Sequence, residues 1–430
     1  MLKQRMSTGM SIITIVLSLF LCSCQTREEL PEGAEYFEPV WFENLSEFVT
    51  GNHNEFTKFK DGLSVVSFSE MSENWSRSDI VNVVIDRSGE LAFSPFYGDY
   101  DVSVIDSESI YVEDNESETG VILDINSNVI GAFDGCLISD RKTREKMNAE
   151  DVAVLGYNNI ISTRPYQNKW LYGLAKKNGE VLVDPTYCEV LAGVSEEYFI
   201  FSIDDTQKNA DVYHTDGTFL HRIDLEYGIY QYKNGMFILH SDSGYGVANI
   251  TGTVIFEPNN KSVNVLSEDL IIVSKSGSND YQLFDGKGNL IKDLELSSAY
   301  QISQLYNDVF AVCDYSKTYF ISSEGEFLKE YEGRFARYCG DGVFSIQEDD
   351  EVQLVDGDTL ELIGEKYRDT YDIKFYDGYS IARDLDGNDV IIDCNGNKYC
   401  EGYDVLGVSE NIVRVSRNKY PGVIYLPPQK

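Results

Sequence analysis

Six consecutive residues near the C-terminal end of the chain, Asp384-Leu385-Asp386-Gly387-Asn388-Asp389, carry the side chains that a calcium-binding loop uses. Alternating carboxylates beside a glycine can wrap around a hard cation. The segment departs from the EF-hand pattern twice, because counting from Asp384 the glycine is the fourth residue and not the sixth, and the twelfth residue is Asn395 and not a bidentate glutamate. We therefore interpret it as a surface turn between the first two strands of a repeat and predict no metal site.

Other patterns for catalysis or metal binding are missing from the sequence. It has no Gly-x-Ser-x-Gly elbow, no P-loop and no His-Glu-x-x-His pair. Its four histidines lack metal-ligand spacing. His214 and His221 lie on opposite sides of a predicted hairpin turn, where a shared ligand is the less favoured alternative, and we predict no metal site. With 72 acidic residues, no pair of carboxylates for glycoside hydrolysis can be singled out. We predict no catalytic residue and no cofactor.

The first 24 residues have the pattern of a secretory signal. Lys3 and Arg5 precede a short apolar run, Ile12 to Leu21, and small residues follow before a cleavage point. The run has about ten residues, whereas a helix that spans a bilayer needs roughly 20. Because the run is too short to span a bilayer, we predict that this segment is an export signal.

The end of that signal, Leu21-Cys22-Ser23-Cys24, closely resembles the lipobox of bacterial lipoproteins. The resemblance implies that residues 1–23 are a signal peptide that is removed, that Cys24 is diacylated, and that residues 24–32 are a lipidated tether. It also implies a place in the bacterial cell envelope, facing outside the cytoplasm, with a membrane as a partner through the lipid anchor.

Six cysteines follow the lipobox, and an exported chain is able to oxidise them. A two-residue loop at Asn395-Gly396 would place Cys394 opposite Asn397 and Ile391 opposite Cys400, so the last two cysteines are not paired across the hairpin. We predict that most of the six are small buried side chains.

The charge of the chain restricts its partners. Acidic residues number 72 against 35 Lys and Arg, which gives a formal net charge of −37. Nucleic acid is excluded as a partner because its binding needs clustered basic residues, and an anionic membrane surface is disfavoured for the same reason. The hydrophobic content of 42%, with 29 Tyr and 22 Phe, indicates a folded chain.

Short apolar runs of strand character recur ten times along the chain. They lie at residues 63–66, 110–112, 160–161, 198–200, 236–238, 270–272, 309–311, 343–345, 379–381 and 412–414. A second strand follows each run and usually ends in a tight polar turn. The turns carry a glycine at Gly89, Gly179, Gly217, Gly252, Gly288, Gly325 and Gly396. Successive turns from Gly179 to Gly325 are 35 to 38 residues apart, which is the regularity of a repeat array.

Two turns of the series lack glycine, at Asn126 and Thr359. Glycine there supplies a positive φ, and we expect Asn126 to be the better substitute because Asn tolerates the left-handed region.

Two units of the array resemble the WG-repeat (KWG) proteins of bacteria. The first has Lys169-Trp170-Leu171-Tyr172-Gly173-Leu174, then Asn178-Gly179, Val181 to Pro185 and Tyr187; the second has Tyr245-Gly246-Val247, Gly252 and Val254 to Pro258. The other units keep the period but lose Trp and Pro. The resemblance implies a protein that interacts and does not catalyse.

The two ends of the chain look like halves of one unit. Gly33 and Pro39 have the same six-residue spacing as Gly89 and Pro95, so we expect residues 35–49 to supply the last two strands of a unit. The C-terminal segments 412–416 and 422–426 would supply the other half. Residues 33–430 are thus predicted to be an all-β repeat domain of about ten short four-stranded units in a β-propeller-like closed ring, with two five-bladed propellers or an open β-solenoid as alternatives.

The predicted function is a cell-surface lipoprotein with a non-enzymatic domain that binds a protein or a glycan. The alternative is a surface enzyme, a propeller hydrolase or lyase that processes polysaccharide. Aromatic residues that are candidates to stack on sugars are Tyr36, Phe37, Trp41, Phe42, Tyr97 and Tyr100, although in a sheet protein such side chains are usually core.

Overall fold

The computed structural model describes residues 39–48, 53–69, 80–114, 119–133, 137–138, 152–159, 169–192, 197–277, 280–294, 296, 299, 301–314, 316–368, 373–401, 404–417 and 420–427. Cys24, the signal peptide and the tether predicted at 24–32 lie outside these ranges. The described chain is all-β, with 38 strands in small antiparallel sheets and one short 3-10 helix.

Five sheets consist of four successive strands each. Two are β2 (His53–Phe56), β3 (Leu63–Ser69), β4 (Ile80–Asp86), β5 (Phe96–Tyr97), and β6 (Tyr100–Asp106), β7 (Ser109–Asp114), β8 (Thr119–Asp124), β9 (Val129–Phe133). Two more are β10 (Leu137–Ile138), β11 (Val152–Asn159), β12 (Lys169–Lys176), β13 (Val181–Tyr187), and β14 (Glu189–Ala192), β15 (Tyr198–Ser202), β16 (Asn209–His214), β17 (Phe219–Asp224). The fifth is β25 (Gln301–Ile302), β26 (Val309–Cys313), β27 (Lys317–Ser322), β28 (Phe327–Glu332).

Two sheets have seven strands. The first is β18 (Gly228–Lys233), β19 (Met236–Ser241), β20 (Gly244–Asn249), β21 (Val254–Ser267), β22 (Leu270–Lys275), β23 (Tyr281–Asp285), β24 (Leu290–Leu294). The second is β29 (Phe335–Gly340), β30 (Val343–Glu348), β31 (Glu351–Asp356), β32 (Leu362–Arg368), β33 (Tyr379–Arg383), β34 (Asp389–Asp393), β35 (Lys398–Glu401). Strand β21 is 14 residues long because its first half pairs with β20 and its second half with β22, so it ends one repeat and begins the next.

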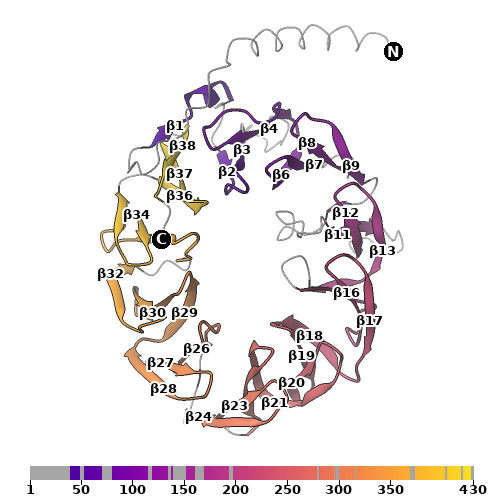
Figure 1. Cartoon of the computed structure of the whole chain (residues 1–430), viewed down its shortest axis with the longest axis vertical. Helices are drawn as coiled ribbons and strands as arrows, with labels where there is room; N and C mark the ends of the chain where they lie inside the picture. Colours follow the sequence, from indigo (N-terminus) through magenta and orange to yellow (C-terminus); the bar gives the residue numbers. More distant parts are fainter. Residues whose placement is uncertain are drawn as a thin grey trace. The chain divides into compact units, whose positions relative to one another are not determined.

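The terminal sheet combines the two ends of the described chain. Its order is β1 (Val40–Trp41), β38 (Tyr420–Tyr425), β37 (Ile412–Arg417), β36 (Asp404–Ser409). Val40 lies opposite Val423 and Trp41 opposite Gly422, and Figure 1 shows β1 beside β38. The Phe42 backbone N–H also donates to the Pro421 carbonyl at 3.1 Å. The ends of the repeat array therefore meet in one sheet.

The expectation that residues 35–49 supply two strands is wrong. Within the part that is described, they supply the single strand β1, followed by the 3-10 helix η1 (Glu43–Phe48). The cause lies in the spacing of Phe42, Leu45 and Phe48, since residues three apart fall on one face of a helix with three residues per turn. All three side chains are buried. The terminal sheet thus takes three strands from the C-terminal segment and one from the N-terminal segment.

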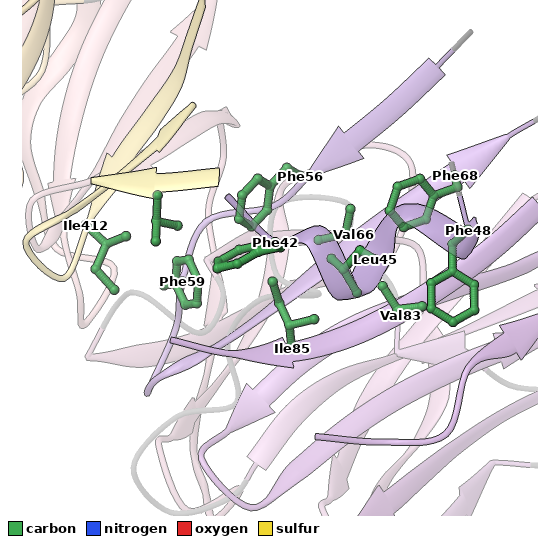
Figure 2. Close-up of a cluster of buried hydrophobic side chains, with 11 residues drawn as sticks. Phe42, Leu45, Phe48, Phe56, Phe59, Val66, Phe68, Val83, Ile85 and Ile412 are labelled. Carbon is green, nitrogen blue, oxygen red and sulfur yellow. The ribbon is translucent and has the colours of Figure 1, made fainter. Parts of the chain in front are cut away.

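The core is divided among clusters that lie between consecutive repeats, including the two repeats of each seven-stranded sheet. One cluster joins η1 to β2, β3 and β4 and also to Ile412 and Val423 of the terminal sheet. Figure 2 shows Phe42 and Leu45 among its side chains, and the rings of Phe42 and Phe56 pack edge to face at 6.3 Å. Another cluster joins the opposite side of the terminal sheet, through side chains such as Val413 and Ile424, to β33 and β34.

The predicted turn glycines are confirmed. All seven, from Gly89 to Gly396, have φ between 77° and 86°. In the two turns that lack glycine, the positive φ falls on Ser127 and Leu360, not on Asn126 and Thr359. Asn126 is displaced from that role because the turn is set by Asp124, whose carboxylate accepts the backbone N–H groups of Asn126 and Asn128 at 2.9 and 2.8 Å.

Candidate binding site

A hollow of about 250 Å³ opens between the first strands of two successive repeats, β18 and β21, with β19 and β20 also contributing. It is lined by Tyr230, Gln231, Lys233, Ile238, Tyr245, Ser262, Val263 and Asn264. We call it the β18–β21 hollow. Its polar lining consists of two phenols, two amides, one hydroxyl and one ammonium, with no carboxylate among the lining residues.

A β-bulge positions the aromatic side of the hollow. Ile229 lies opposite Leu239 and Gln231 opposite Ile238, so Tyr230 is an extra residue in β18. A bulge redirects the side chain that it carries. Tyr230 is 62% exposed, although it belongs to a strand whose Ile229 and Tyr232 are buried.

Three aromatic side chains gather beside this bulge. The Tyr230 and Tyr245 rings pack edge to face with centroids 5.7 Å apart, and the His240 ring lies 5.6 Å from Tyr245. Tyr245 is held in place by its neighbour Gly246, where a Cβ atom would lie 2.4 Å from the Phe256 carbonyl oxygen. The close backbone approach at Gly246 fixes the strand that carries the second phenol.

Lys233 supplies the charge of the hollow. Among the described residues, no carboxylate pairs with its ammonium, and burial without a countercharge lowers the pKa of Lys233. Several other lysines of the described chain are paired, among them Lys292 with Glu326 at 2.5 Å and Lys366 with Glu351 at 3.0 Å. In a chain with a net charge of −37, a half-buried lysine without a countercharge is unusual.

A second hollow, of about 200 Å³, lies between the segment Thr57–Lys60 and β6. Its lysines are already engaged. The Lys58 ammonium lies 4.2 Å from the centre of the Tyr376 ring, and Lys60 Nζ lies 3.5 Å from the Val104 carbonyl oxygen. Because those contacts occupy the charged groups, the β18–β21 hollow is the better candidate for binding.

Tyr187, Asp211, Tyr213 and Arg222 form a hydrogen-bonded network elsewhere in the described chain. Asp211 is 2% exposed, accepts the Tyr187 hydroxyl at 2.7 Å, and receives Arg222 Nε and Nη2 at 2.7 and 2.8 Å. Burial opposes ionisation of Asp211, but the bonds from Arg222 and Tyr187 keep its pKa below the ordinary value. Burial and the Tyr213 and Asp211 contacts raise the pKa of Tyr187.

This network ties two repeats together. Tyr187 ends β13, whereas Asp211 and Tyr213 lie on β16 of the next sheet, and the Tyr187 and Tyr213 hydroxyls are 2.5 Å apart. Neither hollow includes a member of the network. We interpret it as a structural connection.

The segment that imitates a calcium loop is a hairpin turn between β33 and β34. Asn388 donates its backbone N–H to Asp384 Oδ1 at 2.8 Å and its side-chain amide to Oδ2 at 3.1 Å, which occupies the carboxylate. Among the described residues, no group of three His, Cys, Asp or Glu side chains is arranged to hold a metal ion. Nor does any helix of the described ranges have the length and apolarity needed to cross a bilayer.

The two candidate histidines contact different groups of the protein. His214 Nδ1 lies 3.5 Å from Asp216, whereas His221 Nε2 lies 2.9 Å from the Ile250 carbonyl oxygen of the next sheet.

One of the two predicted cysteine registers is confirmed. Ile391 lies opposite Cys400, but the pairing of Cys394 with Asn397 is wrong because the Asp393 N–H donates to the Asn397 carbonyl and leaves three residues in the loop. Cys188, Cys313, Cys339 and Cys394 are free, and Cys313 and Cys339 are buried. Cys136 lies outside the described residues.

The aromatic candidates from the sequence divide in three. Phe42 is core, and Trp41 packs against the cluster that includes β33 and β34. Tyr97 is 65% exposed, and Tyr100 is half-buried against the core cluster of β3, β4, β6 and β7. Tyr36 and Phe37 lie outside the described residues. Sequence reasoning missed Tyr230 and Tyr245 as a pair, because the bulge that turns Tyr230 outward breaks the alternation on which strand patterns depend.

Comparison with known proteins gives no family. No family model matches the sequence, and no curated protein matches it. Among solved structures, a crystal structure of a eukaryotic initiation factor is 8% identical with a TM-score of 0.47 and covers 88% of this chain and 100% of its own. Hsv2p of Kluyveromyces lactis is 11% identical, with a TM-score of 0.32 over 63% of this chain and 98% of its own. Apo AztD from Citrobacter koseri is 11% identical, with a TM-score of 0.32 over 64% of this chain and 85% of its own. Scores this low carry no argument about activity or ligand.

Proposed function

We propose that this chain is a bacterial cell-surface lipoprotein, anchored through Cys24, whose non-enzymatic β-repeat domain of the WG-repeat type binds a protein or a glycan. The observation that carries binding is the β18–β21 hollow, where the exposed ring of Tyr230, the half-buried ring of Tyr245, neutral hydrogen-bonding groups and an uncompensated ammonium converge. Such a lining holds and orients a ligand. The sequence Leu21-Cys22-Ser23-Cys24 supports the anchor.

The proposed domain is a closed ring of ten units. Counting each seven-stranded sheet as two repeats gives ten, and ten hydrophobic clusters each join one repeat to the next. The pairing of β1 with β38 supports closure, because it places both ends of the array in one unit.

Hydrogen bonds between hairpin turns also support closure. The Gly378 N–H donates to the Asp341 carboxylate at 2.7 Å, and the Glu410 N–H donates to Asp377 at 2.8 Å. The Gly62 N–H then donates to Glu410 at 3.0 Å. The same kind of bond therefore continues from the C-terminal repeats across the terminal sheet to the first repeat.

Two experiments test the proposal. Cys24→Ala should release the protein from the membrane fraction, since each buried methylene of an acyl chain contributes roughly 0.8 kcal/mol to anchoring; unchanged retention contradicts the anchor. Glycan arrays and pull-down with residues 26–430 should capture a ligand that is recovered unmodified. Recovery of cleaved polysaccharide would favour the hydrolase or lyase alternative, and capture of nothing would contradict a binding role.

A further inference from the structure

The β18–β21 hollow has a size that limits its occupant. Its volume of about 250 Å³ is just below the range of roughly 300–1,000 Å³ in which drug-sized ligands bind. One six-membered ring with its substituents fits such a space. The part of the ligand that enters the hollow is therefore about the size of one sugar ring, whether a small molecule or a single residue of a polymer.

The neutral groups of the hollow indicate a polyhydroxylated ring. Gln231 and Asn264 each offer both a donor and an acceptor, and the Ser262 hydroxyl offers both as well. The exposed Tyr230 ring, braced edge to face by Tyr245, presents a face of negative electrostatic potential. The C–H groups on one side of a pyranose carry partial positive charge and pack on such a face, while its hydroxyls reach the amides.

The charged group of the hollow indicates a carboxylate on that ring. Lys233 is half-buried, the hollow has no acidic lining residue, and no carboxylate of the described chain pairs with the ammonium. A carboxylate bound at this position would accept a charge-assisted hydrogen bond from the Lys233 ammonium, which would replace the water that the ammonium loses through burial. The acidic surface of the chain opposes this only weakly, because charges farther away than about 8 Å are screened at physiological ionic strength.

We propose that the β18–β21 hollow binds one carboxylated sugar residue, a hexuronate, with its ring on Tyr230 and its carboxylate on Lys233. This inference rests on the proposed binding function and names the ligand class. The amides of Gln231 and Asn264 hold the ring hydroxyls. Sugars that lack the carboxylate bind more weakly because they leave the ammonium without a countercharge.

The test uses the full-length protein in detergent micelles and three probes: D-glucuronate, its uncharged counterpart D-glucose, and acetate. Affinities come from ligand-observed NMR titration. D-glucuronate should bind about tenfold or more tightly than either of the other two. Lys233→Met should remove the preference for D-glucuronate over D-glucose, and Tyr230→Ala should weaken both sugars.

Lys261→Met is the matched control, because it removes the same charge from β21, next to the lining residue Ser262, at a residue outside the lining of the hollow. The control should keep the preference, and thermal melting should show that all variants fold. Equal affinity for D-glucose, equal affinity for acetate, or a preference that survives Lys233→Met would each overturn the inference. A protein that captures another ligand in array or pull-down assays while ignoring D-glucuronate overturns this inference and leaves the proposed function standing.

Discussion

Replacing Phe42 with alanine should destabilise the terminal sheet and the repeat that follows it. Phe42 is 2% exposed and packs on Phe56 and on Gly89, where a Cβ atom would lie 2.2 Å from the Phe42 ring. So tight a fit leaves little room for the neighbours to collapse into the cavity. The cost should therefore fall within the range for buried phenylalanine, about 3–5 kcal/mol, with the lost ring contact included.

Hydrogen exchange measured by mass spectrometry localises this effect. A loss of about 4 kcal/mol in local opening free energy corresponds to roughly a thousandfold loss of protection, and we expect it in the peptides that contain β38, β2 and β3. Phe327→Ala is the control, because Phe327 is 47% exposed on β28 and its removal should cost only about 1 kcal/mol.

The reasoning is refuted if the two variants lose the same protection, or if Phe42→Ala leaves β38 unchanged. Either result would mean that the segment containing β1 and η1 does not pack where the core cluster places it.

Three further predictions concern turns, networks and bulges. Burial of Asp393 opposes its ionisation, but hydrogen bonds from Asn397 lower its pKa below the ordinary value of 3.8. The ionised carboxylate therefore stabilises the fold above about pH 4, and this stabilisation is lost as the pH falls through the pKa of the folded state. Asp393→Asn should accordingly lower the urea midpoint at pH 7 but leave it unchanged at a pH below that pKa. Asp211→Asn should lower the free energy of unfolding by about 1–2 kcal/mol in urea titrations, the low end for charged hydrogen bonds because its partner arginine is largely solvated; an unchanged midpoint would exclude the network as a structural connection. Gly246→Ala should lower the melting temperature clearly, through a backbone clash worth about 1–3 kcal/mol or more, whereas Gly228→Ala, whose Cβ would find its nearest neighbour at 3.7 Å, should not; similar melting of the two variants would contradict the steric argument.

Sequence reasoning found the repeats because their signals are local. A glycine with positive φ and a short apolar run each act within a few residues, so Gly179 and Gly252 could be assigned without any structure. A local steric requirement also explains the second glycine position in the two units that resemble WG repeats. Gly173 and Gly246 face bulges at Pro185 and Pro258, where a Cβ atom would meet the opposite backbone at 2.2 and 2.4 Å.

An Asp or Asn recurs three residues before the positive-φ residue of many turns, and this signal was not used to predict the turns from the sequence. Asp86, Asp124, Asn249, Asp285 and Asp393 each accept backbone N–H groups two and four residues later. Part of the acidic composition is therefore structural.

The binding hollow and the terminal 3-10 helix could not be predicted from strand patterns. The hollow depends on a bulge at Tyr230 and on the approach of two strands from different repeats. Neither feature produces a periodic pattern of residues in the sequence. The helix was missed because two strands were expected in residues 35–49 from the Gly33–Pro39 spacing alone, although the three-residue spacing of Phe42, Leu45 and Phe48 indicates a 3-10 turn.

The pairing of β1 with β38 is the central structural claim, and a disulfide between Val40→Cys and Val423→Cys tests it most directly. Directly opposite residues of antiparallel strands have Cα atoms about 4.5–5.5 Å apart, which is within disulfide range, and these two residues are directly opposite. Val40→Cys with Val415→Cys is the control, because Val415 lies one strand farther away on β37. Mass spectrometry after mild oxidation should identify a linked peptide joining residues 40 and 423 and none joining 40 and 415. Absence of the first link, or equal yields of both, would contradict the account.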